Sequence, residues 1–347
     1  SASDGTGAAS SMMSWATDGD LKGVSAASCV TPALKQSLMV SGTKTGITQQ
    51  LVVANPSAKA TSVNIKVWGS DKAGALALST GSTLTVGAGK ESILNLAAAA
   101  SEQDALYVTV SSADTPVAAV VRTITMDGLT SKGSDYAVPN NVSAKTLAIN
   151  GLSEGDDVNL YVYPSQQSDV TVSWTDGTGT KNTNQQTLEA NRVSVIDLGS
   201  VPKSATGLTI SATEPVTAAA KVTSDGDGDQ ADFALVNASV PMNVSAMAVP
   251  DHATAQVSVT NTSDDDRTAT LTSYNGDGDI VEQSDLAIRA GASTTIELAD
   301  INDGDVDAVS LADPDQSMVW NIRVSQKDVL DAKLAGVSII SATDLKE

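Results

Sequence analysis

Alternation of apolar and polar residues marks three stretches of the chain that lie about 100 residues apart. A period of two places every second side chain on one face of an extended backbone, so each stretch predicts a half-buried β-strand. The residues on that face are Val63, Ile65 and Val67, then Val170, Val172 and Trp174, and then Ala269, Leu271 and Ser273. Turn-forming Gly, Asn, Asp and Pro separate these and similar runs, which favours an all-β fold.

These strands belong to a plan that occurs three times along the chain. The segments "TQQLVVANPSAKATSVNIKVWGSDKAG" from Thr48, "DDVNLYVYPSQQSDVTVSWTDGTG" from Asp156 and "TAQVSVTNTSDDDRTATLTSYNGDGD" from Thr254 share it. Each has an alternating run, a polar turn and a second alternating run that ends in an aromatic residue. Further along, "TPVAAVVRT", "EPVTAAAKV" and "QSMVWNIRV" also align. Their equivalent basic residues are Arg122, Lys221 and Arg323.

The repeat predicts the fold class and the division of the chain. We expect an all-β protein of three tandem immunoglobulin-like β-sandwich repeats of about 100 residues each. The predicted parts are a polar stalk or linker over 1–28, repeat 1 over 29–139, repeat 2 over 140–241 and repeat 3 over 242–347. The Cys-Trp-Cys pattern of antibody domains is missing, so the prediction concerns sandwich architecture only. A β-propeller is a weaker alternative, because its blades are about half as long.

Composition restricts the partners of this protein. Asp and Glu number 41 against 20 Lys and Arg, which gives a net charge of −21. Such a surface repels phosphate backbones and anionic lipid headgroups, so we expect no nucleic-acid partner and no membrane insertion. Cys29 is the single cysteine, so no disulfide can form within the chain. Aromatic residues make up only 3% of the chain, so aliphatic side chains must fill the cores.

The segment "KVTSDGDGDQADFAL", residues 221–235, is the sharpest chemical feature of the sequence. Its carboxylates make it a candidate calcium site, because calcium prefers six to eight oxygen ligands. The four candidate ligands are Asp225, Asp227, Asp229 and Asp232. Gln230 stands where an EF-hand has glycine, and Val236 stands where it has glutamate, so the loop is not an EF-hand. The alternative, an exposed acidic turn between two strands, is the interpretation that we favour.

The aromatic residue that ends the second run of each repeat is a candidate for carbohydrate binding. These residues are Trp68, Trp174 and Tyr274. If they face solvent, they form a repeated stacking surface for sugars. The alternative, which we favour, is that each ring fills the end of its sandwich, where Val and Ala leave space.

Candidates for catalysis are scarce. His252 is the only histidine, and its position in the loop "VPDHATAQ" favours an exposed turn residue over a catalytic base. Cys29 has no basic neighbour in sequence, so we interpret it as a buried or partly buried inert thiol. One histidine and one cysteine cannot close a structural zinc site. We therefore expect a protein that is not an enzyme, with no cofactor apart from the calcium candidate.

Two segments resemble a known family. Residues 29–74 contain a Gly turn, a strand that ends in Leu-x-x-x-Asn-Pro, and a later Gly. The residues of this pattern are Gly46, Leu51, Asn55, Pro56 and Gly69. Together with "PVAAVVRTITMDGLTSKGSDY" at 116–136, they resemble an exported actinobacterial family of unknown function, most strongly over 29–138. The resemblance implies an extracellular place in the cell envelope, an N-terminal anchor upstream, and a structural Asn-Pro turn.

These observations together predict a non-catalytic, exported, modular protein of the cell envelope. We expect a rod or platform that acts as a structural, adhesion or assembly scaffold and binds an envelope protein or glycan. The alternative function is a carbohydrate-binding module array that uses the Trp and Tyr residues at the strand ends.

Overall fold

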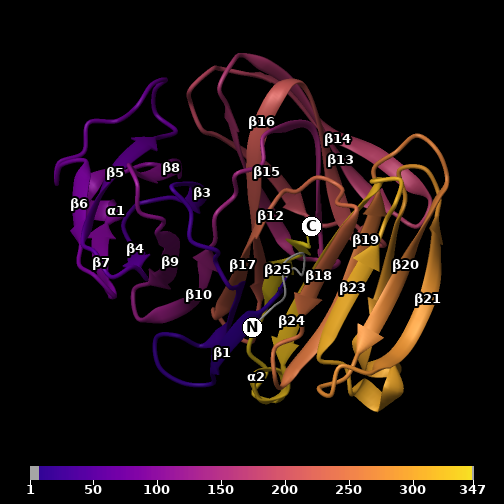
Figure 1. Ribbon diagram of the computed structural model, residues 1–347. Coiled ribbons are helices and arrows are strands. Elements are labelled where there is room, and N and C mark those ends of the chain that lie inside the picture. The colour runs from indigo at the N-terminus through magenta and orange to yellow at the C-terminus, as the bar shows by residue number, and fades with distance from the viewer. Residues whose placement is uncertain (1–7, 346–347) are drawn as a thin grey trace.

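The computed structural model describes residues 8–345 and is built almost entirely of antiparallel strands (Figure 1). The prediction of an all-β fold is therefore confirmed. The two α-helices are short, α1 (Leu96–Ala99) and α2 (Lys327–Asp331). Two 3₁₀ turns, η1 (Leu298–Asp300) and η2 (Asn302–Gly304), follow one another in the third part of the chain. Among the described residues, no helix is long and apolar enough to cross a membrane.

Unit 1 comprises strands β3 to β10 and has two four-stranded sheets. The first contains, in spatial order, β6 (Thr83–Val86), β5 (Thr61–Trp68), β8 (Ala105–Ser112) and β3 (Lys35–Ser41). The second contains β7 (Lys90–Asn95), β4 (Ile47–Asn55), β9 (Ala118–Asp127) and β10 (Thr130–Ala137). Apolar residues from both sheets meet in one core, because each strand turns every second side chain inward.

Unit 2 comprises β11 to β17 and joins the two halves through one long strand, β16 (Gly207–Asp225). Residues 207–212 of this strand pair with β13, and residues 216–223 pair with β12. Pro215 stands between the two parts, where it supplies no N–H to a ladder. The other strands are β11 (Ala144–Asn150), β12 (Asp157–Pro164), β13 (Ser168–Asp176), β14 (Gly179–Leu188), β15 (Ser194–Ser200) and β17 (Ala231–Asn237).

Unit 3 comprises β18 to β26 and has two sheets that enclose a third core. The first contains β21 (Ile280–Ile288), β20 (Arg267–Tyr274), β23 (Ala308–Ala312), β18 (Val244–Ala248) and β26 (Thr343–Asp344). The second contains β22 (Ser293–Glu297), β19 (Ala253–Asn261), β24 (Met318–Gln326) and β25 (Ser338–Ser341).

The three units share one strand order. If the strands of each unit are counted from one, with the two parts of β16 as six and seven, the sheets read 4-3-6-1 and 5-2-7-8. Unit 3 adds a ninth strand, β26, next to its first strand. In constant-type immunoglobulin domains the first two strands are neighbours, whereas here the first strand pairs with the sixth. The units therefore have the predicted two-sheet layering but a strand order of their own.

The N-terminal segment does not form the predicted stalk over its described part. Strands β1 (Ser11–Ala16) and β2 (Gly23–Ser28) pair as a hairpin, and β2 packs against β10 of unit 1 and β25 of unit 3. Small residues allow this burial: Val24 is 1% exposed and Ala26 is 4% exposed. Residues 1–7 of the predicted stalk lie outside the described residues.

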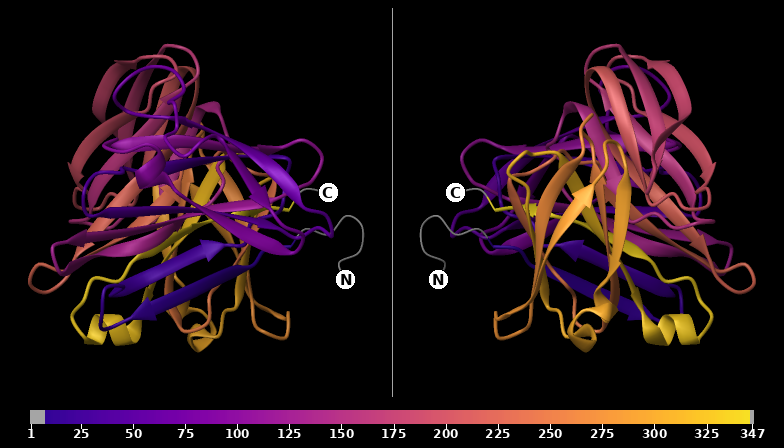
Figure 2. Two further views of the ribbon diagram at one scale, coloured as in Figure 1. Left: turned by 90° about the vertical axis from the view of Figure 1, so that its left-hand side faces the viewer. Right: turned by 90° about the vertical axis from the view of Figure 1, so that its right-hand side faces the viewer.

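The units do not line up as a rod, because units 2 and 3 each contribute to the core of the unit before it. Phe233 and Leu235 of β17 complete the core of unit 1. Ile339 of β25 and Val337, just before this strand, complete the core of unit 2. Ala26 of the hairpin does the same for unit 3. Figures 1 and 2 show the result, in which three units and the hairpin surround a common centre.

Candidate functional site

The predicted calcium loop is an open turn at the periphery of the central junction. Asp225, Asp227 and Asp229 are exposed, whereas Asp232 lies buried in β17. The loop is held by the N–H of Asp227, which donates to the carbonyl of Lys333 at 2.9 Å. Within residues 8–345, no three acidic, His or Cys side chains are grouped so as to hold a metal ion. The four aspartates therefore do not converge as calcium ligands do.

The three candidate sugar-binding rings occupy three different environments. Trp174 is 6% exposed and lies in the core of unit 2. Trp68 is half-buried and packs 5.6 Å from Tyr163 of the neighbouring unit, measured between ring centroids. Tyr274 is half-buried, with its hydroxyl 3.2 Å from that of Ser310. The three rings therefore do not share one exposed position.

The two residues considered for catalysis, His252 and Cys29, are both exposed. His252 lies in a turn before β19 and contacts the ring of Trp15 edge-on, with centroids 5.9 Å apart. Cys29 is exposed, so the prediction of a buried or partly buried thiol was wrong. It follows β2, where the chain leaves the hairpin and runs along the surface.

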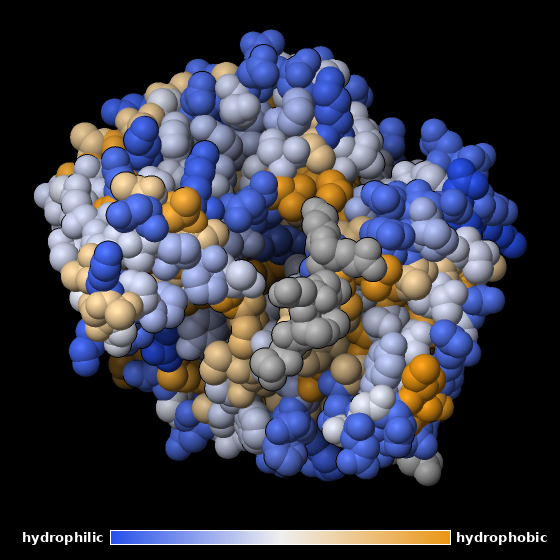
Figure 3. Space-filling model, viewed as in Figure 1, coloured by the Kyte–Doolittle hydropathy of each residue, from blue (hydrophilic) through white to orange (hydrophobic). Residues whose placement is uncertain are grey.

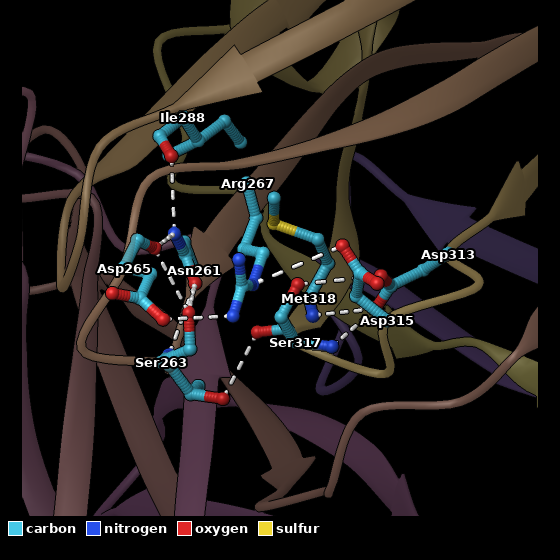
Figure 4. Close-up of polar contacts among 10 residues, drawn as sticks. Asn261, Ser263, Asp265, Arg267, Ile288, Asp313, Asp315, Ser317 and Met318 are labelled. Atoms are coloured by element: carbon cyan, nitrogen blue, oxygen red, sulfur yellow. Dashed lines mark hydrogen bonds and ion pairs between the residues drawn. The ribbon is translucent and has the colours of Figure 1, made fainter.

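In the Asn-Pro turn of the family pattern, the buried side chain of Asn55 connects two loops by hydrogen bonds. The side-chain amide of Asn55 donates to the carbonyls of Lys59 at 2.7 Å and Val86 at 3.3 Å. Asn261 of unit 3 repeats the arrangement by donating to the carbonyls of Asp265 at 2.8 Å and Ile288 at 3.0 Å (Figure 4). Asparagine satisfies the turn and the opposite loop at once, which explains the residue type structurally.

The central junction contains the buried carboxyl group of Asp232, which the sequence grouped with the exposed aspartates of the calcium candidate. Asp232 accepts the N–H groups of Val24 at 2.8 Å and Val337 at 3.0 Å through Oδ2. It thereby joins the hairpin, unit 2 and unit 3. Its Oδ1 atom is buried without a hydrogen-bond partner among the described residues. Burial raises the pKa of Asp232 to about 7, although the N–H donors oppose the shift.

Two glycines leave the space that this carboxylate occupies. Gly23 of β2 and Gly133 of β10 have φ values of 126° and 97°. A Cβ atom on either would lie 2.4 Å from a carboxyl atom of Asp232. Any side chain larger than that of glycine at either position would therefore displace the Asp232 carboxyl group.

A second buried carboxylate lies nearby on β10. Asp135 accepts the N–H of Leu235 at 2.8 Å and the hydroxyl of Ser338 at 3.1 Å, so it joins all three units. Burial raises its pKa well above the usual range, and the charge of Asp232 contributes to the shift. The similar sequences "DYA" and "DFA" suggest one shared position, but Asp135 pairs with Thr123 and Asp232 pairs with Ser224 in their ladders. Thr123 is one residue after Arg122, whereas Ser224 is three residues after the equivalent Lys221. The two aspartates therefore occupy positions two residues apart in the repeat.

An ion pair connects units 2 and 3 beside this centre. Arg323 donates to both carboxylate oxygens of Asp156, at 2.7 and 3.1 Å, and to the carbonyl of Gly151 at 2.9 Å. The Asp156 side chain is 5% exposed, and the Arg323 side chain is 19% exposed. Alongside, the N–H of Asn150 donates to Asn321 Oδ1 at 2.9 Å. The paired charges fix the angle at which unit 3 meets unit 2.

The ends of four strands surround a shallow hollow on the face that carries the chain termini. Its volume is about 270 Å³, and it is lined by residues that follow or end β2, β10, β17 and β25. Among these residues are Cys29, Pro139, Asn237 and Ser341. Figure 3 shows hydrophilic residues over most of the rim of this face and more hydrophobic residues near its centre. The junction thus combines buried carboxylates with a partly apolar opening.

Fold and site define an all-β protein of three interlocked two-sheet units with a polar central junction. The chain belongs to the family of unknown function DUF5719, whose family model matches residues 1–299. No curated protein matches the chain. A solved structure, "Crystal structure of dimeric latent PorU from Porphyromonas gingivalis", is 10% identical and covers 89% of this chain and 34% of that chain. Its TM-score of 0.18 is too low to indicate a common fold.

Proposed function

We propose that the protein is a non-catalytic, exported scaffold of an actinobacterial cell envelope, with a structural, adhesion or assembly role. The observation that carries the proposal is that β17 of unit 2 contributes to the core of unit 1 and β25 of unit 3 contributes to the core of unit 2. This interlocking favours one rigid block over independent modules, because separating two units would expose Phe233 or Ile339 to water. Rigid blocks suit the presentation of surfaces at fixed positions.

The repeated strand order supports a second part of the proposal. Three units with the order 4-3-6-1 and 5-2-7-8 fit the triplication of one immunoglobulin-sized sandwich. Duplication within a chain places equivalent faces around a centre, and partner sites can then diverge between copies. The proposed partners are an envelope protein or a glycan.

Fractionation of cells of the source organism that express the tagged full-length protein tests its location. We expect the protein in the envelope fraction or the medium, and we expect external protease to remove the tag from intact cells. A tagged cytosolic enzyme provides the control for lysis. Recovery of the protein with the cytosolic control would contradict the proposal.

Scattering and unfolding measurements test the rigid block. We expect a compact scattering profile that matches the three-unit arrangement and one cooperative unfolding transition that several probes report alike. Three separate transitions, or an extended profile, would mean that the units behave as independent beads.

A further inference from the structure

One basic position recurs on the outer face of the second sheet in each unit. Arg323 lies opposite Gln256 and Ile339 in its ladders, and Arg122 lies opposite Gln50 and Tyr136 in the same way. In unit 3 this face packs against unit 2. In unit 1 it packs against the N-terminal hairpin, so the two arginines have different neighbours.

The neighbour of Arg323 supplies a carboxylate. Asp156 binds the guanidinium at 2.7 and 3.1 Å, and the hydroxyl of Ser224 lies 3.2 Å from it. Two parallel N–H···O contacts are the geometry in which a guanidinium binds a carboxylate best. The position is therefore suited to hold a carboxylate at the boundary between two elements.

Arg122 has no such partner. The Arg122 side chain is half-buried and makes no hydrogen bond, ion pair or ring contact with any residue from 8 to 345. Instead it lines a cavity of about 120 Å³ between β10 and the hairpin. The hairpin contributes Ser14, Trp15 and Leu21 to the walls. Arg122 thus borders a cavity at the position where its counterpart Arg323 binds the carboxylate of Asp156.

We propose that this cavity binds a carboxylate group, with Arg122 as the cation that holds it. The cavity volume of about 120 Å³ is sufficient for a carboxylate on a short apolar chain. Trp15 and Leu21 supply an apolar wall for that chain. Asp135 also borders the cavity, but its two oxygens already accept the N–H of Leu235 and the hydroxyl of Ser338.

The carboxylate comes either from a small monocarboxylate or from an acidic side chain of a protein. A single half-buried ion pair binds weakly, so we expect a Kd on the order of 1 mM. Two probes separate the sources: propionate, and the blocked peptide acetyl-Gly-Glu-Gly-amide, whose only charge is its side chain. Both are titrated into the full chain at constant ionic strength with chloride as the balancing anion.

The signals to follow are the Arg122 Nε–Hε and Trp15 Nε1–H resonances, which Arg122→Gln and Trp15→Phe assign by deletion. We expect saturable shifts with at least one probe and a loss of affinity of at least about tenfold in Arg122→Gln. Arg289→Gln, at an exposed arginine in unit 3, should bind as the wild type does. Propionate binding alone identifies a small-molecule site, and tighter peptide binding identifies a protein partner.

A second variant keeps the test independent of Arg122 itself. Leu21→Asp places a carboxylate in the wall of the cavity, so it should abolish propionate binding and raise the melting temperature. Absence of saturable shifts with both probes would overturn the proposal. Unchanged affinity in Arg122→Gln or in Leu21→Asp would overturn it as well.

Discussion

The interface between units 1 and 2 is apolar and aromatic, whereas the interface between units 2 and 3 is strongly polar. In the first, Tyr107 of unit 1 stacks on Tyr163 of unit 2 with ring centroids 4.0 Å apart. Phe233 of unit 2 enters the core of unit 1 and is fully buried. In the second, Arg323 pairs with Asp156 at the equivalent face. Strand insertion is common to both interfaces, and the side-chain chemistry around it is not.

The comparison is sharpest at the repeated basic position. Arg323 has a buried carboxylate, but Lys221 has none, and its ammonium lies 4.3 Å from the centroid of the Phe233 ring. Burial lowers the pKa of Lys221 to about 8. The basic side chain at this repeated position therefore stabilises the interface between units 2 and 3, where it is Arg323. Between units 1 and 2, where it is Lys221, its burial costs free energy.

Phe233→Ala should have the largest effect, because it empties the core of unit 1 from the side of unit 2. We expect the free energy of unfolding to fall by about 3–5 kcal/mol, the usual cost of deleting a buried ring. Urea unfolding of the full chain measures it. Leu129→Ala, at a side chain that is 98% exposed, is the control and should change almost nothing. Equal effects of the two variants would mean that the units do not share a core.

Asp156→Ala should weaken the polar interface by about 2–3 kcal/mol, because it leaves Arg323 unpaired. The partial exposure of the guanidinium keeps the loss below that of a fully buried pair. Alanine at the exposed neighbour Asp157 provides a matched control in the same unfolding assay. A smaller loss in Asp156→Ala than in Asp157→Ala would show that the ion pair does not stabilise the interface.

The buried carboxylate at the centre predicts a pH dependence. Because the pKa of Asp232 is raised to about 7 in the folded state, its folded form binds a proton that the unfolded form has lost. Its stabilising proton is therefore fully present below pH 4 and is lost as the pH rises through about 7. We expect unfolding free energy to fall by about 2 kcal/mol from pH 5 to pH 8.

Asp232→Asn tests this assignment, because the amide keeps the shape and does not titrate. The variant should show a flatter profile between pH 5 and pH 8. Asp135 shifts in the same direction, so some slope should remain. A variant profile parallel to that of the wild type would assign the titration to another group.

Lys221→Met should stabilise the protein by about 1 kcal/mol, since it removes an unpaired charge from a mostly buried site. Its counterpart, Arg323→Met, should destabilise, because Asp156 loses its partner. The gain in Lys221→Met should be greatest below pH 8, where the lysine is charged in both states, and should fade as the pH approaches 10.5. Two effects of the same sign would contradict the proposed difference between the interfaces.

Calcium should have the smallest effect of all. Because Asp225, Asp227 and Asp229 point to solvent and Asp232 is buried elsewhere, we expect no shift in the melting temperature when calcium is added to chelator-treated protein. A calorimetric titration checks the same point. Saturable heat with a higher melting temperature would restore the loop as a calcium site, since a ligand of the folded state must stabilise it.

Much of the architecture could be read from period and repetition. Alternation at Val63, Ile65 and Val67 corresponds to β5, and all three side chains are in the core. The alignment of Arg122, Lys221 and Arg323 matches their equivalent places in the ladders. These features could be predicted because a strand's facing pattern depends on nearest neighbours in the chain.

The site could not be predicted, because its members come from separate parts of the chain. Asp232 looked like the last residue of an acidic loop, yet it binds the backbone of Val24 and Val337, more than 100 residues away in each direction. A local signal was present: "FALV", directly after Asp232, is apolar at four successive positions, as expected for a strand buried on both faces. That pattern shows that both faces are covered but does not show by which unit.

The sequence by itself determined the strands, the threefold repeat, the acidic surface and the polar Asn turns, because each depends on short-range periodicity or composition. Only the tertiary structure decided which unit completes which core, that the N-terminal hairpin packs between units 1 and 3, and which charged side chains are buried. Those outcomes depend on contacts between residues far apart in the chain. Three copies with one strand pattern can therefore acquire an ion pair, a mostly buried lysine and an arginine that lines a cavity at the same position.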